Sequence, residues 1–404
     1  MKNFLKTPFV KFTGTWKRLK IQYKIIILII SAIIVGLTSY YAVDLYLNQD
    51  RISIKLPDAN LRNSVTLVPP TPLPPKYSPI NGVEVDYETY DELLSRKPVA
   101  IVVNNHKEAR PQSGLSMADT VMEVLAEGGI TRYVAVYHNN FAVEKIGPIR
   151  SLRYYMIDFA SGYDDAIILH HGWAGFDNAD FEVYNAETDA RGAISKFNVK
   201  NIHTEASTYR DPVKVKTAGY VHALYTDFDR INSEITRLSN AYKWDIKSNN
   251  LKTLAFKDDS PEVERGSFTS VDVKFMSLGG SDYASRFTYD RASNTYPRFI
   301  GGQSDIDSLT NKQIAPKNVI IEWHDYADAK DGHSRLVIKM IGENKATILR
   351  DGQIIEGRWK KDTRLSRTQY FDLAGNEIEL NRGQIWIVNV VKVQDRLIST
   401  VTIL

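Results

Sequence analysis

The chain of 404 residues contains no cysteine. This absence excludes a disulfide framework, a thiolate metal site, a cysteine nucleophile and a lipid-modified N-terminal cysteine. The rest of the composition is ordinary, with 43% hydrophobic and 25% charged residues. A chain of this kind is not disordered as a whole and is long enough for roughly two domains of ~150 residues.

Acidic residues are absent from 1–24, which carry seven lysines and arginines, and every kind of charged residue is absent from 25–43. As a helix, the uncharged stretch would be about 28 Å long, close to the thickness of a bilayer core. We therefore predict a single transmembrane helix at 25–43 that acts as a signal-anchor, with the basic tail 1–24 in the cytoplasm. A cleaved signal peptide is the alternative, but the apolar run exceeds the usual ~7–15 residues and no small-x-small cleavage site follows it.

The net charge of +3 comes from the basic tail, since taking away its seven positive charges leaves −4 for the remainder. The part of the chain after the helix is therefore no obvious nucleic-acid binder. An exported chain without cysteine fits an envelope in which folding does not depend on disulfides, as in Gram-positive bacteria. We predict a location in the cytoplasmic membrane, single-pass, with the C-terminal domains outside.

Three segments follow the predicted helix. Residues 44–77 form a linker, which the proline-rich run at 69–75 stiffens. Residues 78–245 mix buried-strand runs with helical periods, which predicts an α/β domain. Residues 251–404 hold about eight short strand-like runs separated by turn residues, which predicts a mostly-β domain. The change in texture near residue 250 predicts two separate cores.

Several elements of the first domain can be placed. Short apolar runs predict buried strands at 99–103 and 164–169. The run at 121–127 fits a helix or a strand, and we prefer a strand because Gly128 and Gly129 follow it and a hairpin partner at 133–137 comes next. Helical spacing after Pro148 predicts a helix that begins there and completes a right-handed βαβ unit. A capping box at 226–229 predicts a second helix.

Specific strings of residues then point to a family. They include Arg110-Pro111-Gln112-Ser113-Gly114-Leu115 and Glu127-Gly128-Gly129-Ile130-Thr131-Arg132. With further matches up to Gly383-Gln384-Ile385-Trp386-Ile387, they resemble the YerB-like family of extracytoplasmic lipoproteins of Gram-positive bacteria over most of 78–395. The resemblance implies two domains, an extracytoplasmic location and no established biochemical activity.

Two departures from the family pattern matter. The family is usually tethered by a lipidated cysteine, which this chain lacks, so the predicted helix at 25–43 takes over the anchoring. A histidine of the family pattern is replaced by Ser304, so any role of that histidine is not expected here.

Polar residues end the predicted strands of the first domain, and this is where we expect a site. If the strands at 99–103 and 166–170 are parallel, their C-terminal ends lie at one edge of the sheet, where open α/β sheets bind ligands. Arginines at the predicted helix start near 150 add positive charge, which favours an anionic or polyhydroxyl ligand. The candidate ligand-binding residues are Asn104, Asn105, His106, Arg110, Glu127, Arg132, Arg150, Arg153, His170 and His171.

Other chemistries have weaker support. The histidines lack the spacing of helical metal ligands, and no Gly-x-Ser-x-Gly string surrounds Ser151, so neither a metal, nor another cofactor, nor a serine triad is predicted. Trp323, Trp359 and Trp386 could form a carbohydrate platform, although strand aromatics are more often core. The leading hypothesis is a membrane-anchored envelope protein that binds a wall glycan, an anionic ligand or a wall-remodelling protein without catalysis. The alternative is a hydrolase of an envelope polymer that uses the strand-end residues.

Overall fold

The computed structural model describes Ser31, 33–40, Val43, 73–176, 183–248, 250–275, 281–393, 396–397 and 399–404. The chain divides into two units, Met1–Pro72 and Leu73–Leu404. In the first unit the described residues are helical, and nine of the 19 residues of the predicted membrane helix at 25–43 lie outside them. Within the part of the chain that is described, no helix has both the length and the apolar character needed to cross a membrane.

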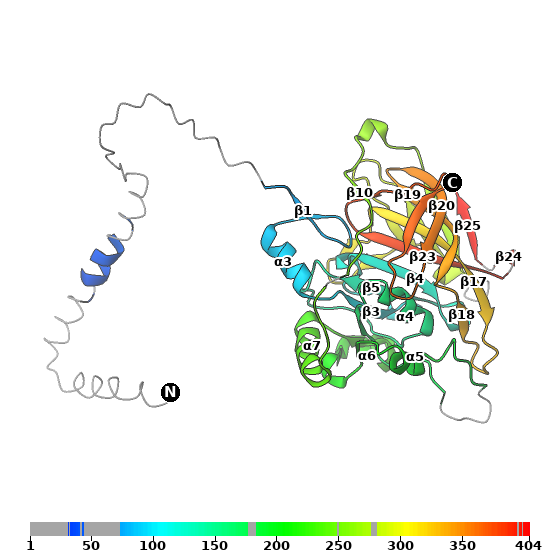
Figure 1. Ribbon diagram of the computed structural model, residues 1–404, viewed down its shortest axis with the longest axis horizontal. Coiled ribbons are helices and arrows are strands. Elements are labelled where there is room, and N and C mark those ends of the chain that lie inside the picture. Colours follow the sequence, from blue (N-terminus) through cyan, green and yellow to red (C-terminus); the bar gives the residue numbers. More distant parts are fainter. Residues whose placement is uncertain are drawn as a thin grey trace. The chain divides into compact units, whose positions relative to one another are not determined.

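The second unit is organised around one twelve-stranded sheet (Figure 1). Strand β23 joins its two halves, because it pairs in parallel with β17 on one side and with β4 on the other. In spatial order the strands are β21 (Gln369–Asp372), β20 (Gln353–Lys361), β19 (Gly342–Arg350), β17 (Asn318–Asp328), β23 (Ile385–Val393), β4 (Thr120–Leu125), β5 (Thr131–Tyr137), β3 (Val99–Asn104), β6 (Ile167–Leu169) and β7 (Asn201–Ile202), with β18 (Leu336–Ile338) paired to β17 and β24 (Arg396–Leu397) paired to β23.

The hydrophobic core is continuous across the two halves of this sheet. Trp386 of β23 is fully buried, and its ring contacts Tyr133 of β5 and Phe287 of β12 (Ser285–Thr288), with centroids 5.5 and 6.3 Å apart. The prediction of two separate cores is therefore wrong, because the last long strand of the chain returns to pair with the first half. The boundaries 78–245 and 251–404 themselves stay a prediction.

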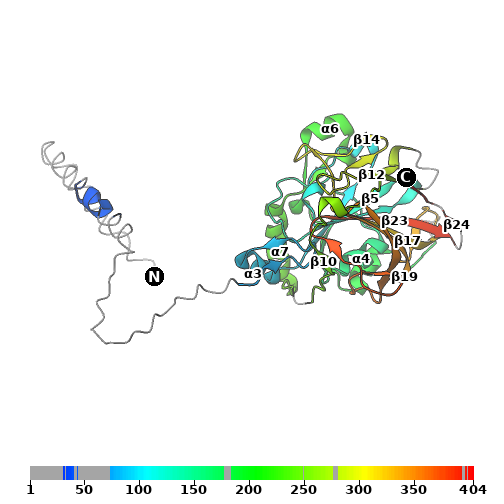
Figure 2. The same ribbon diagram turned by 90° about the horizontal axis from the view of Figure 1, so that it is seen from above.

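The helices lie in the first half of the second unit, between Tyr87 and Tyr242. They are α3 (Tyr87–Ser95), α4 (Tyr154–Ser161), α5 (Ala190–Lys196), α6 (Pro212–Ala218) and α7 (Phe228–Tyr242). Helix α7 is present as predicted, but its N-cap is Asp227 and not Thr226, since the side chain of Asp227 accepts a hydrogen bond from the backbone N–H of Arg230 at 2.9 Å. Figure 2 shows that β17, β19 and β23 curve around α4, and Arg364 donates a hydrogen bond to Ser161 at the end of that helix.

Most predicted strands of the first half are confirmed, but their connection is not the one expected. Strands β4 and β5 form the predicted hairpin, and β3 and β6 are parallel. Because β5 runs antiparallel to β3, the chain from β5 through α4 to β6 is not a parallel βαβ unit. Helix α4 begins at Tyr154, not at Pro148.

The segment before α4 is extended because tertiary hydrogen bonds outweigh its helical spacing. The backbone N–H of Asn104 donates to the carbonyl of Pro148 at 2.8 Å, and that of Arg150 donates to the carbonyl of Val102 at 2.9 Å. Further on, the N–H of Leu152 donates to the carbonyl of Gly172 at 3.0 Å. The segment therefore crosses the ends of β3 and β6, and this course places Arg150 at the edge of the sheet.

The second half of the unit is mostly β, as predicted, and no helix longer than a 3-10 turn occurs among its described residues. Its second sheet has the order β14 (Gln303–Ser304), β13 (Arg298–Ile300), β12 (Ser285–Thr288), β11 (Ser270–Lys274) and β25 (Thr400–Ile403). Short two-stranded pairs complete the unit: β1 (Lys76–Tyr77) with β2 (Glu84–Val85), β8 (Tyr209–Arg210) with β9 (Leu224–Tyr225), β10 (Phe256–Lys257) with β22 (Leu380–Asn381), and β15 (Ile306–Asp307) with β16 (Lys312–Gln313).

Candidate functional site

The C-terminal ends of β3, β4, β6 and β7 meet at one edge of the sheet. Strands β3, β6 and β7 are parallel to one another, and β4 points the same way because both β3 and β4 are antiparallel to β5. Strand β5 begins at this edge. The polar residues that follow or open these strands are therefore neighbours, as the parallel arrangement of β3 and β6 predicts.

Four of the candidate residues form a group that we call the edge cluster: Glu127, Arg132, Arg150 and Arg153. Arg153 donates two hydrogen bonds to the carboxylate of Glu127, at 2.5 and 2.9 Å. Arg132 donates to the backbone carbonyl of Ser151 at 2.9 Å and lies 3.5 Å from the same carboxylate. Burial alone would raise the pKa of Glu127, but the hydrogen bonds and charges of the two arginines lower it to about 2.

Arg150 differs from the other two arginines. Its guanidinium makes no hydrogen bond or ion pair with any residue that the structure describes, and it is half-buried. Burial, together with the positive charge of Arg153, lowers its pKa, while Glu127 acts in the opposite direction. The edge cluster thus holds three arginines and one carboxylate, an excess of two positive charges. The helix start predicted near 150 is wrong, because α4 begins at Tyr154, so the guanidinium of Arg150 and not a helix N-terminus supplies the positive charge.

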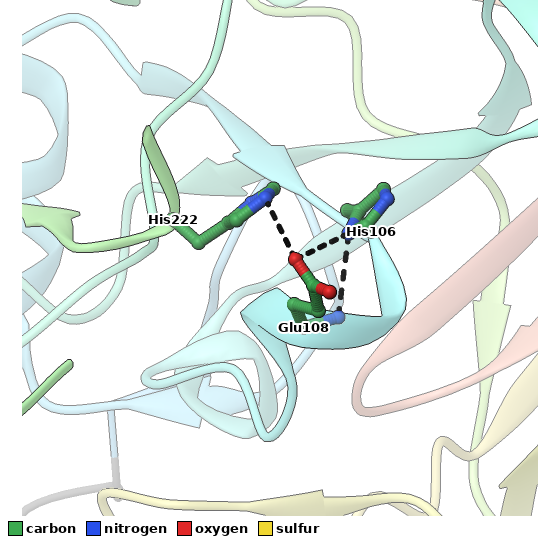
Figure 3. A group of neighbouring side chains, drawn as sticks. All are labelled: His106, Glu108 and His222. Atoms are coloured by element: carbon green, nitrogen blue, oxygen red, sulfur yellow. Dashed lines mark hydrogen bonds and ion pairs between the residues drawn. The ribbon is translucent and has the colours of Figure 1, made fainter. Parts of the chain in front are cut away.

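A second group lies next to Arg150 and consists of His106, Glu108 and His222 (Figure 3). One carboxylate oxygen of Glu108 is 3.5 Å from Nε2 of His222 and 3.9 Å from Nδ1 of His106. The two imidazole rings stack with centroids 4.6 Å apart. Burial, followed by the charges of His106 and Arg150, lowers the pKa of His222, which shows that Arg150 lies close enough to affect this group.

Asn104 determines how His222 is protonated. Its side-chain oxygen accepts the backbone N–H of His106 at 2.9 Å, so its amide nitrogen must be the atom 3.0 Å from Nδ1 of His222. Nδ1 then accepts a hydrogen bond, and the proton of the neutral ring lies on Nε2, facing Glu108.

The group His106, Glu108 and His222 offers the two imidazoles and one carboxylate of a zinc site, with ligand atoms within 4.8 Å of one another. The present arrangement opposes a cation, since Nε2 of His222 carries a proton and the charges of Arg150 and Lys214 act on the same ring. A metal would need the Asn104 side chain to turn. The expected lack of a metal stays a prediction.

Asn105 and Arg110 lie elsewhere. Asn105 is fully buried and donates to Thr131 at 2.6 Å, while its side-chain oxygen accepts from Nε of Arg110 at 3.1 Å. Arg110 also donates to the backbone carbonyl of Asp282 at 2.7 Å, and its guanidinium lies 5.0 Å from the ring centroid of Tyr283. These two candidates connect the loop after β3 to the second half of the unit, so their contacts are structural.

The histidines after β6 are at the predicted edge, but His170 faces inwards. His170 is fully buried and bonds through Nδ1 to the carbonyl of Gly172 at 2.8 Å, and burial lowers its pKa to about 3. The backbone N–H of His171 donates to the carbonyl of Arg150 at 3.1 Å. His138, in contrast, follows the antiparallel strand β5 and therefore lies at the opposite end of the sheet.

The tryptophans considered for a carbohydrate platform are core residues. Trp323, Trp359 and Trp386 are 8%, 2% and 0% exposed. The hypothesis of a platform on these three rings is therefore wrong. Conversely, sequence reasoning missed Glu108 and His222, because neither belongs to a motif and His222 is 118 residues from the asparagine that orients it.

The fold and the strand edge define an α/β protein whose C-terminal β half extends the same sheet. The chain belongs to the DUF3048 family: the model of its N-terminal domain, described as of unknown function, matches residues 86–241, and that of its C-terminal domain matches 271–387. A protein of Bacillus subtilis (strain 168) named putative lipoprotein YerB is 30% identical over 285 residues, which are 70% of this chain and 78% of that protein.

The crystal structure of YerB from Bacillus subtilis shows the same fold. It superposes with a TM-score of 0.64 at 24% identity, covering 81% of this chain and 99% of the YerB chain. The resemblance stated from the sequence is thereby confirmed, as is a mixed α/β region followed by a mostly-β region.

Proposed function

We propose that this protein is a membrane-anchored cell-envelope protein that binds an anionic ligand at the edge cluster without catalysis. The observation that carries this proposal is the guanidinium of Arg150, which has no hydrogen bond or ion pair with the described residues, while Arg132 and Arg153 share the carboxylate of Glu127. A folded protein gains nothing from placing a third arginine beside two others unless something negative neutralises it.

Of the three expected ligand classes, a wall glycan, an anionic ligand and a wall-remodelling protein, the edge cluster favours the anionic ligand. Guanidinium groups bind phosphate or carboxylate through two parallel hydrogen bonds, which suits a rigid anionic group better than a neutral one. An envelope polymer that carries phosphate or carboxylate groups has this chemistry. A wall-remodelling protein that carries phosphate or carboxylate groups has the same chemistry. We do not propose a nucleic acid as the ligand.

The location is part of the proposal. It is supported by the uncharged stretch 25–43 behind seven positive charges, and by the name of the YerB relative, a putative lipoprotein. We expect protease added to intact protoplasts to remove the part after the helix, while the protein stays in the membrane fraction before digestion. Complete protection of residues 73–404 would overturn the topology.

The binding is tested by calorimetry on the full chain in detergent, with inorganic phosphate and inorganic polyphosphate as probes. We expect Arg150→Ala to weaken binding by about tenfold or more, equivalent to ~1.4 kcal/mol, and Arg150→Lys to restore part of it. Arg286→Ala is the matched control, because it also removes one positive charge, but from the pair between Arg286 of β12 and Asp272 of β11 at the surface. Equal losses in Arg150→Ala and Arg286→Ala would show a general charge effect and contradict the proposal.

One observation favours the alternative, a hydrolase. Asn104 fixes the His222 ring so that the Nε2–H of His222 faces the carboxylate of Glu108. In this arrangement the carboxylate can take a proton from water, and the imidazole stabilises the carboxylate. If the protein hydrolyses a phosphate ester bound by Arg150, Glu108→Gln abolishes turnover of p-nitrophenyl phosphate and leaves phosphate binding intact. A protein that binds phosphate but releases no p-nitrophenol excludes this alternative for that ester.

A further inference from the structure

A pocket of about 490 Å³ lies beside the edge strand β7. Its walls are the end of α5 with the turn after it, β7 with the residues that follow, and the C-terminal end of α7. None of the ten candidate residues predicted from the sequence lines it. Its volume falls within the range of roughly 300–1,000 Å³ that is usual for small-molecule sites.

Two aromatic rings form one side of this pocket. Helix α7 ends at Tyr242, and Lys243 has the left-handed conformation with φ of 55°, which turns the chain and brings Trp244 next to Tyr242. The two rings stack with centroids 6.3 Å apart and planes inclined by 24°. Tyr242 is 69% exposed, so its ring contributes little to the core and presents an apolar face to the solvent.

The lining of the pocket also includes a polar pair. Asn201 and His203 stand two residues apart, so they face the same way along the extended chain, and their side chains bond to each other at 2.8 Å through the amide nitrogen and Nδ1. Whichever group donates in this bond, two N–H donors and one acceptor of the pair keep no partner among the described residues. Burial and the nearby His171 lower the pKa of His203, so the ring is neutral near pH 7.

The pocket carries no free charge among its described lining residues. Its charged lining residue, Arg237, donates hydrogen bonds of 3.0 and 2.8 Å to the carboxylate of Glu234. The hydroxyl of Thr204 donates to the same carboxylate at 2.8 Å. An anion would therefore find no unpaired cation here, in contrast to the edge cluster.

We propose that this pocket binds a neutral sugar residue of a polysaccharide. The C–H face of a pyranose ring would lie on Tyr242 and Trp244, and its hydroxyl groups would bond to Asn201 and His203. A purely apolar ligand would leave the amide and imidazole groups unpaired, which costs free energy. This site goes beyond the anion site, since it uses different residues and a ligand without charge.

The position of the pocket suggests that the sugar it binds is part of a polymer. The ring of His203 stacks on His170, with centroids 5.7 Å apart, and meets Trp173 edge to face at 4.8 Å. His203 therefore separates the pocket from the strand ends. A glycan with neutral sugars and anionic substituents would reach both sites.

Calorimetry on the full chain in detergent tests this proposal, with two uncharged probes: the tetramer of β-1,4-linked N-acetylglucosamine and maltotetraose. We expect at least one of them to bind with a Kd of about 0.1–1 mM. Asn201→Ala should weaken that binding by about fivefold and Trp244→Ala by about tenfold or more, whereas Trp244→Phe, which keeps a flat ring, should retain most of it.

Two control variants test whether a loss of sugar binding is specific to this pocket. Tyr220→Ala removes an aromatic ring that is 63% exposed outside the pocket and should leave the sugar affinity within twofold. Arg150→Ala should also leave it within twofold, so loss of phosphate binding with intact sugar binding would support two separate sites. The absence of binding by both uncharged probes, or binding that survives Asn201→Ala and Trp244→Ala unchanged, would overturn the proposal.

Discussion

Two groups of arginine and carboxylate side chains in this protein have opposite characters. In the interior, Arg298 of β13 lies between Glu123 of β4 and Asp305, and all three are at most 3% exposed. At the strand ends, the edge cluster is partly exposed and holds more arginines than carboxylates. The interior group links the two halves of the unit, because Glu123 belongs to the first half and Arg298 to the second.

The pairing of the charges also differs. In the interior, one terminal nitrogen of Arg298 donates to Glu123 at 2.7 Å and to Ser285 at 2.8 Å, and the other bonds Asp305. Its guanidinium lies 4.6 Å from the ring centroid of Trp386. At the edge, Arg150 has neither a carboxylate nor a ring partner among the described residues. A buried charge must be paired, so the paired arginine Arg298 points to the fold. Arg150 is half-buried beside Arg153 without a partner among the described residues, so it points to a ligand that supplies the negative charge.

The largest effect is expected for Arg298→Ala. It leaves Glu123 and Asp305 buried without their counter-charge, which costs about 3–5 kcal/mol of unfolding free energy, in addition to the lost packing on Trp386. Urea unfolding followed by tryptophan fluorescence measures this loss. Arg286→Ala, which breaks an exposed pair, should leave the midpoint nearly unchanged. If both variants lose equally little unfolding free energy, the group of Arg298, Glu123 and Asp305 does not link the two halves of the unit.

The next effect concerns pH. The pKa of Glu127 is about 2 in the folded protein against an ordinary value of 4.5, so its carboxylate stabilises the fold above pH ~5 and this contribution disappears as the pH falls towards 2. We expect the unfolding free energy of the native protein to fall by about 2–3 kcal/mol more than that of Glu127→Gln over this range.

The native protein must be compared with Glu127→Gln because other carboxyl groups change the unfolding free energy in the opposite direction. Burial raises the pKa of Asp119 and of Asp158 to about 6, so these two carboxyls destabilise the fold as the pH rises from ~4 to ~6. Both occur in the native protein and in Glu127→Gln, and their contributions cancel in the difference. Parallel pH curves for the two proteins would show that Arg132 and Arg153 do not stabilise the Glu127 carboxylate.

The sequence predicted the strands and the edge of the sheet better than the contacts there. The runs at 99–103 and 164–169 and the glycine pair after 127 are local signals, and local signals were enough to place β3, β6 and the β4–β5 hairpin. The extended course of 146–152 depends on hydrogen bonds to β3 and to Gly172, which no local pattern reveals. For the same reason the return of β23 beside β4 was missed, since a parallel pair between residues about 265 positions apart leaves no periodic trace.

For the candidate site, too, local signals were predicted correctly and contacts between distant segments were missed. Asn104, Glu127, Arg132 and His170 were found because each lies at or next to the end of a strand. Glu108 and His222 were missed because their proximity depends on the loop 107–109 and on a turn far along the chain. Asn105 and Arg110 were included because of their position next to β3, but the direction of a side chain into the interior is a tertiary property.

A smaller effect is expected on ligand affinity. Glu127→Gln removes the one carboxylate of the edge cluster and raises its excess positive charge, so phosphate should bind about three- to fivefold more tightly, or ~1 kcal/mol, at low salt. The gain should shrink as salt is added, because the charges are partly exposed. Calorimetry at two salt concentrations measures it. Weaker binding in Glu127→Gln would mean that the carboxylate is needed mainly to hold Arg153 in place.

The smallest effect is expected for the stability of Arg150→Ala, and it decides what the unpaired arginine is for. Since its guanidinium bonds to no described residue, its removal should change the unfolding free energy by no more than about 0.5 kcal/mol, the usual range for a side chain without specific contacts. A slight gain is also compatible, because the positive charge of Arg153 disfavours the charged form of Arg150. The same urea titration as for Arg298→Ala applies, and the variant should unfold in one transition at the native midpoint while its phosphate affinity falls. If Arg150→Ala instead unfolds at a much lower urea concentration, the arginine holds the segment between β3 and β6 together, and the edge cluster is a structural group like the one around Arg298.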